Sequence, residues 1–169
     1  TITTDETGVA KLTDIPLGKY YVKEKETANG YVLDGTAREI DLTYRDQDTA
    51  EVTYSSDWQN NRQKAEVKVL KKEKDSDRVL EGAVFALCNK EDIVNANGDV
   101  ILKADTVIEE QATDKEGKLT FTADLPIGYT YYVKETSPAP GFATTDQVQE
   151  FTFEYEGADK ETLSYEFTF

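Results

Sequence analysis

Apolar and polar residues alternate along most of this chain, which is the pattern of strands that bury one face and expose the other. Turn segments rich in glycine, proline, asparagine and aspartate separate the alternating runs, and no run repeats with a helical period. We therefore predict an all-β fold of the sandwich type. The expected strands lie within residues 1–13, 20–24, 37–44, 50–56, 65–71, 82–87, 107–112, 118–123, 131–135, 149–154 and 162–169.

One motif occurs twice in the chain. Residues 20–24 and 131–135 both read Tyr-Tyr-Val-Lys-Glu, and each copy is followed six residues later by glycine and an aromatic residue. A repeat this close indicates two copies of one supersecondary unit. The polar stretch 59–64 is interpreted as the linker, so we predict one module over residues 1–63 and a second over residues 64–169.

Four polar residues fall on faces that the alternation assigns to the protein interior. Glu24 and Glu135 end the two copies of the repeated motif, each on the same face as two apolar residues. Lys71 ends a similar stripe, and Asn60 ends another, with Asn61 as the alternative if a bulge shifts the register. The plainer interpretations also stay open: a snorkelling lysine, exposed cross-strand glutamates and a linker asparagine.

Composition narrows the function further. The 169 residues include 34 acidic and 19 basic side chains, and the net charge of −15 disfavours binding to nucleic acid or to anionic membranes. No apolar run reaches the roughly 18 residues of a membrane span. The lack of histidine excludes His-dependent triads and most catalytic zinc sites, so we expect no enzyme activity and no cofactor. The single Cys88 is expected to pack beside a strand, and the lack of methionine leads us to expect an excised segment.

Several motifs together resemble a known family. Residues 71–77 and 80–87 resemble the first strand and the Leu-x-Gly-Ala-x-Phe-x-Leu segment of Cna B-type (prealbumin-like) modules, which occur in Gram-positive surface adhesins and sortase-assembled pilins. Residues 131–136 with 140–142 resemble the E-box of these modules, and the first copy departs from it at Lys25, where the family has threonine. The resemblance implies two tandem Ig-like, prealbumin-like β-sandwiches, the first lacking its N-terminal strands.

In this family a lysine of the first strand and an asparagine of the last strand form a spontaneous isopeptide bond, assisted by the E-box glutamate. The resemblance assigns Lys71 and Glu135 to the second module, and Glu24 and Asn60 to the first. Apolar burial favours neutral groups, so that a buried amine can act as a nucleophile while a buried carboxyl group shuttles protons. Each set of three is expected to be incomplete here, because the second asparagine would follow Phe169 and the first lysine would precede Thr1.

The predicted function is that of a stalk or shaft segment in a Gram-positive adhesin or pilin, extracellular and attached to the cell wall, with neighbouring modules as partners. The alternative is an adhesin module that contacts a host protein or glycan through the loop 89–105. A carboxylate-based hydrolase is disfavoured because no distinctive pair of acids is present. Asn95, Asn97 and Asp99 resemble a calcium loop only faintly, since its downstream glutamate is missing, and a plain turn is expected.

Overall fold

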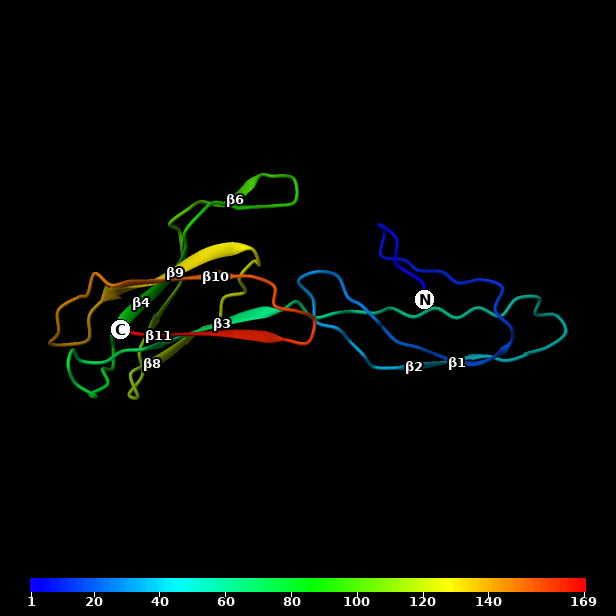
Figure 1. The fold of residues 1–169 in the computed structure, drawn as a ribbon, viewed down its shortest axis with the longest axis horizontal. Helices are drawn as coiled ribbons and strands as arrows, with labels where there is room; N and C mark the ends of the chain where they lie inside the picture. The colour runs from blue at the N-terminus through cyan, green and yellow to red at the C-terminus, as the bar shows by residue number, and fades with distance from the viewer. The chain divides into compact units, whose positions relative to one another are not determined.

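The computed structural model describes residues 1–169, and all of its regular secondary structure is strand (Figure 1). Contacts between Cα atoms divide the chain into two compact units: Thr1–Glu26 with Leu33–Asn60, and Thr27–Val32 with Asn61–Phe169. We call these the first and second units. No helix that could cross a membrane is present. The strands are β1 (Gly18–Val22), β2 (Arg38–Leu42), β3 (Lys64–Leu70), β4 (Val84–Asn89), β5 (Ile93–Val94), β6 (Val100–Leu102), β7 (Val107–Ala112), β8 (Lys118–Phe121), β9 (Tyr129–Ser137), β10 (Val148–Phe153) and β11 (Thr162–Thr168).

The second unit is a two-layer sandwich. One sheet has the strand order β10-β9-β4-β7 and the other β11-β3-β8, and the small β5–β6 hairpin projects from them (Figure 1). All pairs are antiparallel except β3 with β11, which run in parallel along their whole length. Because these neighbours are parallel, the start of β3 and the end of β11 lie at opposite ends of the unit. The predicted all-β sandwich is confirmed.

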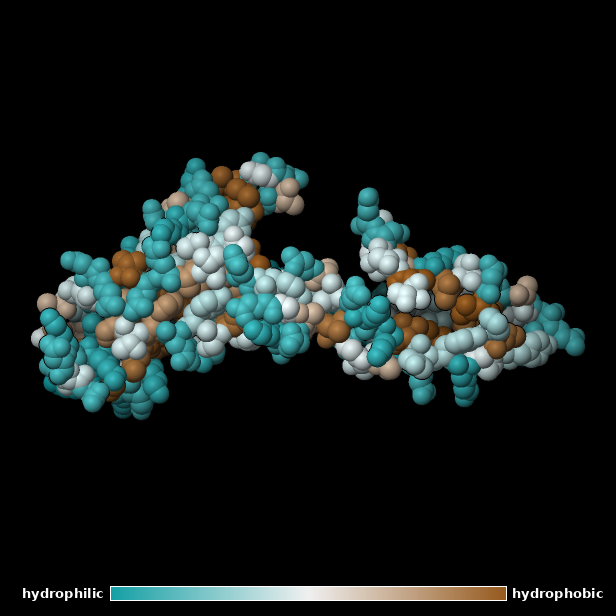
Figure 2. Space-filling view, viewed as in Figure 1, coloured by the Kyte–Doolittle hydropathy of each residue, from teal (hydrophilic) through white to brown (hydrophobic).

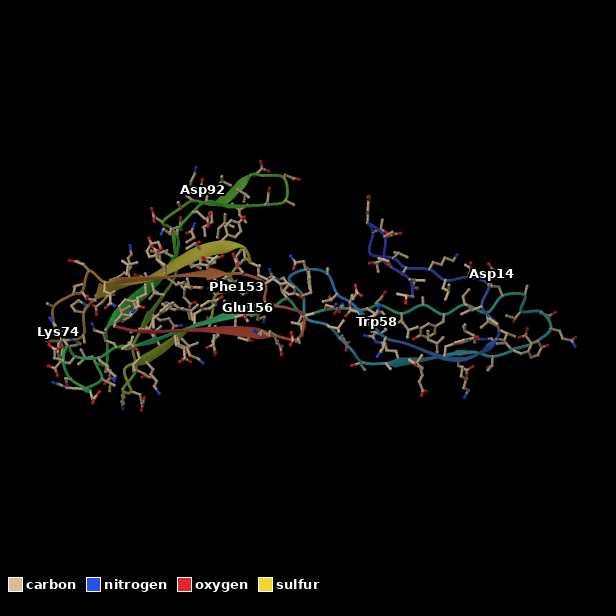
Figure 3. All side chains as sticks on the ribbon, in the orientation of Figure 1. Asp14, Trp58, Lys74, Asp92, Phe153 and Glu156 are labelled. Atoms are coloured by element: carbon tan, nitrogen blue, oxygen red, sulfur yellow. The ribbon has the colours of Figure 1, made fainter.

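Alternating side chains from both sheets fill the core of the second unit. Val67 and Val69 of β3 point inward, and the ring of Phe85 lies 4.8 Å from that of Phe169. Phe153 is fully enclosed, whereas Lys74 lies on a charged turn at the end of the unit (Figure 3). These burials follow the parity of the sequence, because a strand turns successive side chains to opposite faces.

Cys88 faces away from this core and packs with Ala86 and Tyr132 in a small cluster of its own. Burial raises the pKa of its thiol, with opposing contributions from the Tyr132 hydroxyl and the charge of Lys134. A buried thiol with a raised pKa is a poor nucleophile. The expected packing of Cys88 beside a strand is confirmed.

The first unit has much less regular structure. Its only sheet is the antiparallel pair β1–β2, and Leu42 is its only buried hydrophobic residue. Tyr21 is 71% exposed. The strands predicted within residues 1–13 and 50–56 are wrong, since these segments join no ladder. By the repeat, residues 50–56 correspond to β11, which pairs with β3 in the second unit. The first unit contains no strand equivalent to β3, so residues 50–56 have no neighbouring strand with which to form a ladder.

The segment 89–105 folds as a hairpin. The Asn89 side chain fixes its base by donating to the carbonyl groups of Glu91 (2.8 Å) and Lys103 (2.6 Å). At the tip, Oδ1 of Asn95 accepts hydrogen bonds from the amides of residues 97 and 99, each at 2.9 Å. The tip is therefore the plain turn that the sequence predicts. Apolar side chains are visible on the hairpin (Figure 2), and Ile101 is 61% exposed.

Candidate cross-link sites

Lys71 follows the last residue of β3, where the inward stripe of that strand ends. Its backbone is fixed on both sides, because its amide donates to the Gly117 carbonyl at 2.8 Å and its carbonyl accepts from the Leu80 amide at 3.1 Å. The side chain is only 10% exposed. A lysine buried to this extent has its amine held inside the sandwich rather than extended to solvent.

Glu135 lies near the end of β9, and its side chain is completely buried. Oε2 accepts a hydrogen bond from the amide of Thr145 at 2.7 Å. Oε1 lies 3.3 Å from Nζ of Lys71 and accepts no hydrogen bond. The fold therefore brings the Lys71 amine and the Glu135 carboxyl group together inside the core of the second unit.

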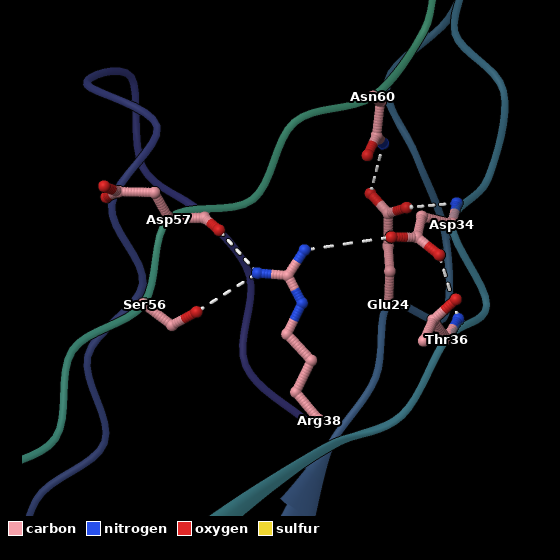
Figure 4. A network of polar contacts seen from close by, with 7 residues as sticks. All are labelled: Glu24, Asp34, Thr36, Arg38, Ser56, Asp57 and Asn60. Carbon is pink, nitrogen blue, oxygen red and sulfur yellow. Dashed lines mark hydrogen bonds and ion pairs between the residues drawn. The ribbon is translucent and has the colours of Figure 1, made fainter.

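The first unit holds a second glutamate at the equivalent position of the repeat, but Glu24 is only partly buried, whereas Glu135 is completely buried (Figure 4). Oε2 of Glu24 accepts from the amide of Asp34 at 3.0 Å, and Oε1 accepts from Nδ2 of Asn60 at 2.6 Å. Asn60 rather than Asn61 therefore faces the carboxylate. The Glu24 carboxylate thus contacts the amide nitrogen of Asn60, the group that would have to leave if Asn60 were an acyl acceptor.

Hydrogen bonds and an arginine–tryptophan contact fix the segments next to Glu24 and Asn60. The Asp34 carboxylate accepts a hydrogen bond from the Thr36 amide at 3.0 Å, and hydrogen bonds from the Thr36 side chain and backbone lower the pKa of Asp34. Arg38 reaches the Asp57 carbonyl at 2.6 Å and lies 4.0 Å from the centre of the Trp58 ring. Arg38 therefore holds the segment that leads to the Asn60 amide against β2, in the absence of a β ladder (Figure 4).

The two glutamate sites are equivalent positions of the repeat. Glu24 and Glu135 are 111 residues apart, and so are the two amides that bond their Oε2 atoms, those of Asp34 and Thr145. Each Oε1 atom then faces a different group, an asparagine amide in the first unit and a lysine amine in the second. No lysine forms an ion pair with Glu24, so each site contains two of the three groups of a lysine–glutamate–asparagine set.

One buried polar residue, Gln63, has no counterpart among the residues that the sequence pattern places in the interior. The predicted linker 59–64 is corrected at this point, because Gln63 is only 1% exposed and Lys64 begins β3. Nε2 of Gln63 donates to the carbonyls of Gly157 (3.1 Å) and Lys160 (2.8 Å), while Oε1 of Gln63 accepts from the Glu156 amide at 3.1 Å. A glutamine among polar neighbours gives no sequence signal for burial, because its partners are backbone groups more than ninety residues away.

Comparison with known families agrees with this architecture. The model of the SpaA prealbumin-like fold domain matches residues 1–58 and 65–166. The chain belongs to the SpaA prealbumin-like family. The prealbumin-like fold expected from the sequence is thereby confirmed, and the two matched segments each contain one copy of the repeated motif. Comparison with curated proteins gives no match.

Several solved structures are similar to this SpaA-like chain. The Bacillus anthracis TIE protein is 26% identical with a TM-score of 0.65, over 99% of this chain and 28% of that one. A Streptococcal ancillary pilin is 22% identical with a TM-score of 0.43, over 99% and 49%. Domains D2 and D3 of the major pilin SpaD from Corynebacterium diphtheriae are 23% identical with a TM-score of 0.41, over 79% and 51%. The chain spans about half the length, or less, of these relatives.

Proposed function

We propose that this chain is a load-bearing stalk segment of a Gram-positive pilin or adhesin, extracellular and attached to the cell wall, in which each module is closed by a lysine–asparagine isopeptide bond. The approach of Lys71 Nζ to Glu135 Oε1 inside the core, at 3.3 Å, is the main support. The equivalent contact of Glu24 with Asn60 supplies the other half of the same set. We place the module boundary between residues 63 and 64, where β3 begins.

The strand order suits a load-bearing role. A force that pulls on the start of β3 and the end of β11 acts in opposite directions on two parallel neighbours, so it loads their ladder in shear. A covalent bond from Lys71 to the segment after β11 would carry this force directly. The force would then bypass the chain between the two cross-linked residues, and the rate at which load unfolds that chain would fall.

The proposed reaction balances as a single amide exchange. The neutral amine of Lys71 attacks the side-chain carbonyl carbon of an asparagine, a carbon–nitrogen bond forms, and the asparagine amide nitrogen leaves as ammonia. Glu135 passes the proton from the attacking nitrogen to the leaving one. The enclosed geometry supplies the high effective concentration that lets an unactivated amide react. The group reacts once, so this is self-modification and not enzyme turnover.

The intact denatured mass tests the proposal. We expect the unmodified mass for the 169-residue chain, since neither site contains all three groups. By the repeat, Asn60 corresponds to a position two residues after Phe169, so a chain extended by two residues that end in asparagine should lose the mass of one ammonia. The same extended chain carrying Lys71→Met or Glu135→Ala should keep its full mass, as should an extension that ends in glycine. Full mass for the asparagine extension would count against the cross-link and leave only the stalk architecture.

The exposed β5–β6 hairpin supports a second candidate function, binding of a host protein or glycan through residues 89–105. Val94, Val100 and Ile101 are all exposed on this hairpin, and apolar side chains that face water on a projecting loop are typical of contact sites. Replacing all three by serine should abolish binding to an extracellular-matrix panel if the hairpin is a contact site. Unchanged binding, or no binding by the parent chain, would count against it.

A further inference from the structure

A tight turn occurs at the same place in each copy of the repeat. Ala28–Tyr31 and Ala139–Phe142 are 111 residues apart, and each is closed by a backbone hydrogen bond from its last residue to its first, at 3.2 and 3.0 Å. The glycines at their third positions, Gly30 and Gly141, have nearly identical φ values of 89° and 88°. The two turns therefore present the same backbone groups in the same geometry.

The first of these turns is fully engaged within the second unit. The Gly30 carbonyl accepts from the Gln63 amide at 2.9 Å, and the Val32 amide donates to the Asn61 carbonyl at 2.8 Å. The Tyr31 carbonyl accepts from the Tyr155 hydroxyl at 3.1 Å. Three backbone groups of the turn are thus satisfied by the end of the unit at which β3 begins.

The second turn has no such partner. The carbonyls of Gly141 and Phe142 and the amide of Ala143, which correspond to the three engaged groups, form no hydrogen bond within the chain. A methyl group placed on Gly30 would lie 3.6 Å from the Ile127 side chain, whereas one placed on Gly141 would meet nothing within 4 Å. The surface that covers the first turn is missing from the second.

The surroundings of the second turn carry a small excess of positive charge. A hollow beside it is lined by two basic residues, Arg78 and Lys115, and one acidic residue, Glu81, together with apolar residues that include Ala139, Pro140 and Phe142. The guanidinium group of Arg78 lies 5.8 Å from the centre of the Phe142 ring. On the surface that the partner would supply, next to Tyr155, Glu154, Glu156 and Asp159 are exposed, and Glu156 forms an ion pair with Lys160.

We propose that residues 139–143 form a docking surface for the β3-start end of a further module like the second unit. The partner would bond the turn through its equivalents of Asn61, Gln63 and Tyr155, in the way that these residues bond the turn at Gly30. This inference rests on the proposed tandem arrangement of modules. Three hydrogen bonds give little affinity between separate molecules, but tethering in one chain raises the effective concentration to the millimolar range.

A tandem chain tests this inference: residues 1–169 followed directly by a second copy of residues 59–169. The first copy carries the substitution Lys71→Met, so that no cross-link can hold the junction together. Amide hydrogen exchange measured by NMR reports the docking. In the 169-residue chain we expect slow exchange at Val32 and fast exchange at Ala143, and in the tandem chain we expect exchange at Ala143 to slow by about tenfold or more.

Two variants make the result specific. Tyr155→Phe in the appended copy should speed amide exchange at Ala143 and leave exchange at Val32 unchanged. The same substitution in the first copy should speed exchange at Val32 and leave exchange at Ala143 unchanged. Exchange at Ala143 that is as fast in the tandem chain as in the single chain would overturn the docking surface. The mass of the tandem chain with Lys71 intact reports the cross-link separately, so loss of ammonia without protection of Ala143 would reject the docking alone. Protection without loss of ammonia would support docking and reject the cross-link.

Discussion

Nζ of Lys71 lies 3.3 Å from Oε1 of Glu135, and both side chains are enclosed by the core of the second unit. Nothing else bonds this oxygen. A buried polar group without a partner destabilises the fold. The contact between Lys71 and Glu135 therefore offsets the unfavourable free energy of removing each of the two groups from water.

This pairing predicts strong coupling between the two residues. Glu135→Leu leaves the buried Lys71 amine without a partner and should lower the free energy of unfolding by about 3–5 kcal/mol. The double variant Lys71→Met, Glu135→Leu fills the same space with apolar atoms and should regain most of that loss. Urea unfolding of the four proteins in the cycle gives the coupling energy. Additive effects of the two single substitutions would show that the residues do not depend on each other.

Gln63 should be a major stability determinant although it lies in a polar stretch. Gln63→Ala leaves two carbonyls and one amide of the 156–160 loop without their partner, so we expect a loss of about 2–3 kcal/mol. Gln59→Ala, at an exposed position of the same stretch, is the matched control and should stay within about 0.5 kcal/mol. Thermal unfolding monitored by near-UV circular dichroism measures both. Equal effects would mean that the Gln63 side chain contributes no more than a surface residue.

Two glycines with positive φ should differ sharply in their tolerance of alanine. Gly98 has φ 88° and open space around it, so Gly98→Ala should cost only the left-handed backbone penalty of about 1 kcal/mol. A methyl group on Gly117 would lie 2.8 Å from the Lys71 carbonyl oxygen and from Cβ of Val79. Gly117→Ala should therefore cost about 3 kcal/mol or more. It should also slow ammonia loss in the asparagine-extended chain, since the Gly117 carbonyl fixes the Lys71 amide.

Glu109 should make stability depend on acid pH. Burial alone would raise the pKa of Glu109, but hydrogen bonds from Gln111, Ala123 and Thr122 outweigh it and lower the pKa below the ordinary value of a glutamate. A lowered folded-state pKa contributes stability that is fully present above the unfolded-state value and is lost as the pH falls through the folded-state value. Glu109→Gln should thus reduce stability at neutral pH and flatten the decline below about pH 4.5.

Urea midpoints from pH 3 to 7 measure this dependence. Glu110→Gln is the control, because the exposed Glu110 carboxylate accepts no hydrogen bond. An equally steep acid decline in the Glu109→Gln protein would assign the pH dependence to other carboxylates.

Local alternation was enough to predict most strands of the second unit, and it placed Lys71 on an inward stripe. The same rule failed for Tyr20 and Val22 of the first unit, which it placed on the inward face with Glu24 and which are both exposed. Parity identifies which residues share a face, but burial of that face requires a second sheet opposite it. The predicted strand over residues 50–56 failed for the related reason that a ladder needs a neighbouring strand.

The sequence by itself determined the all-β fold, the repeat, and the residue types of the candidate sites, because a period of two and a duplicated motif are properties of neighbouring residues. Only the tertiary structure decided which groups meet. It set Glu135 against Lys71, chose Asn60 over Asn61 as the partner of Glu24, and buried Gln63 among distant carbonyls. These contacts join residues that are from 36 to 97 positions apart, and their formation depends on how the sheets pack rather than on any local pattern.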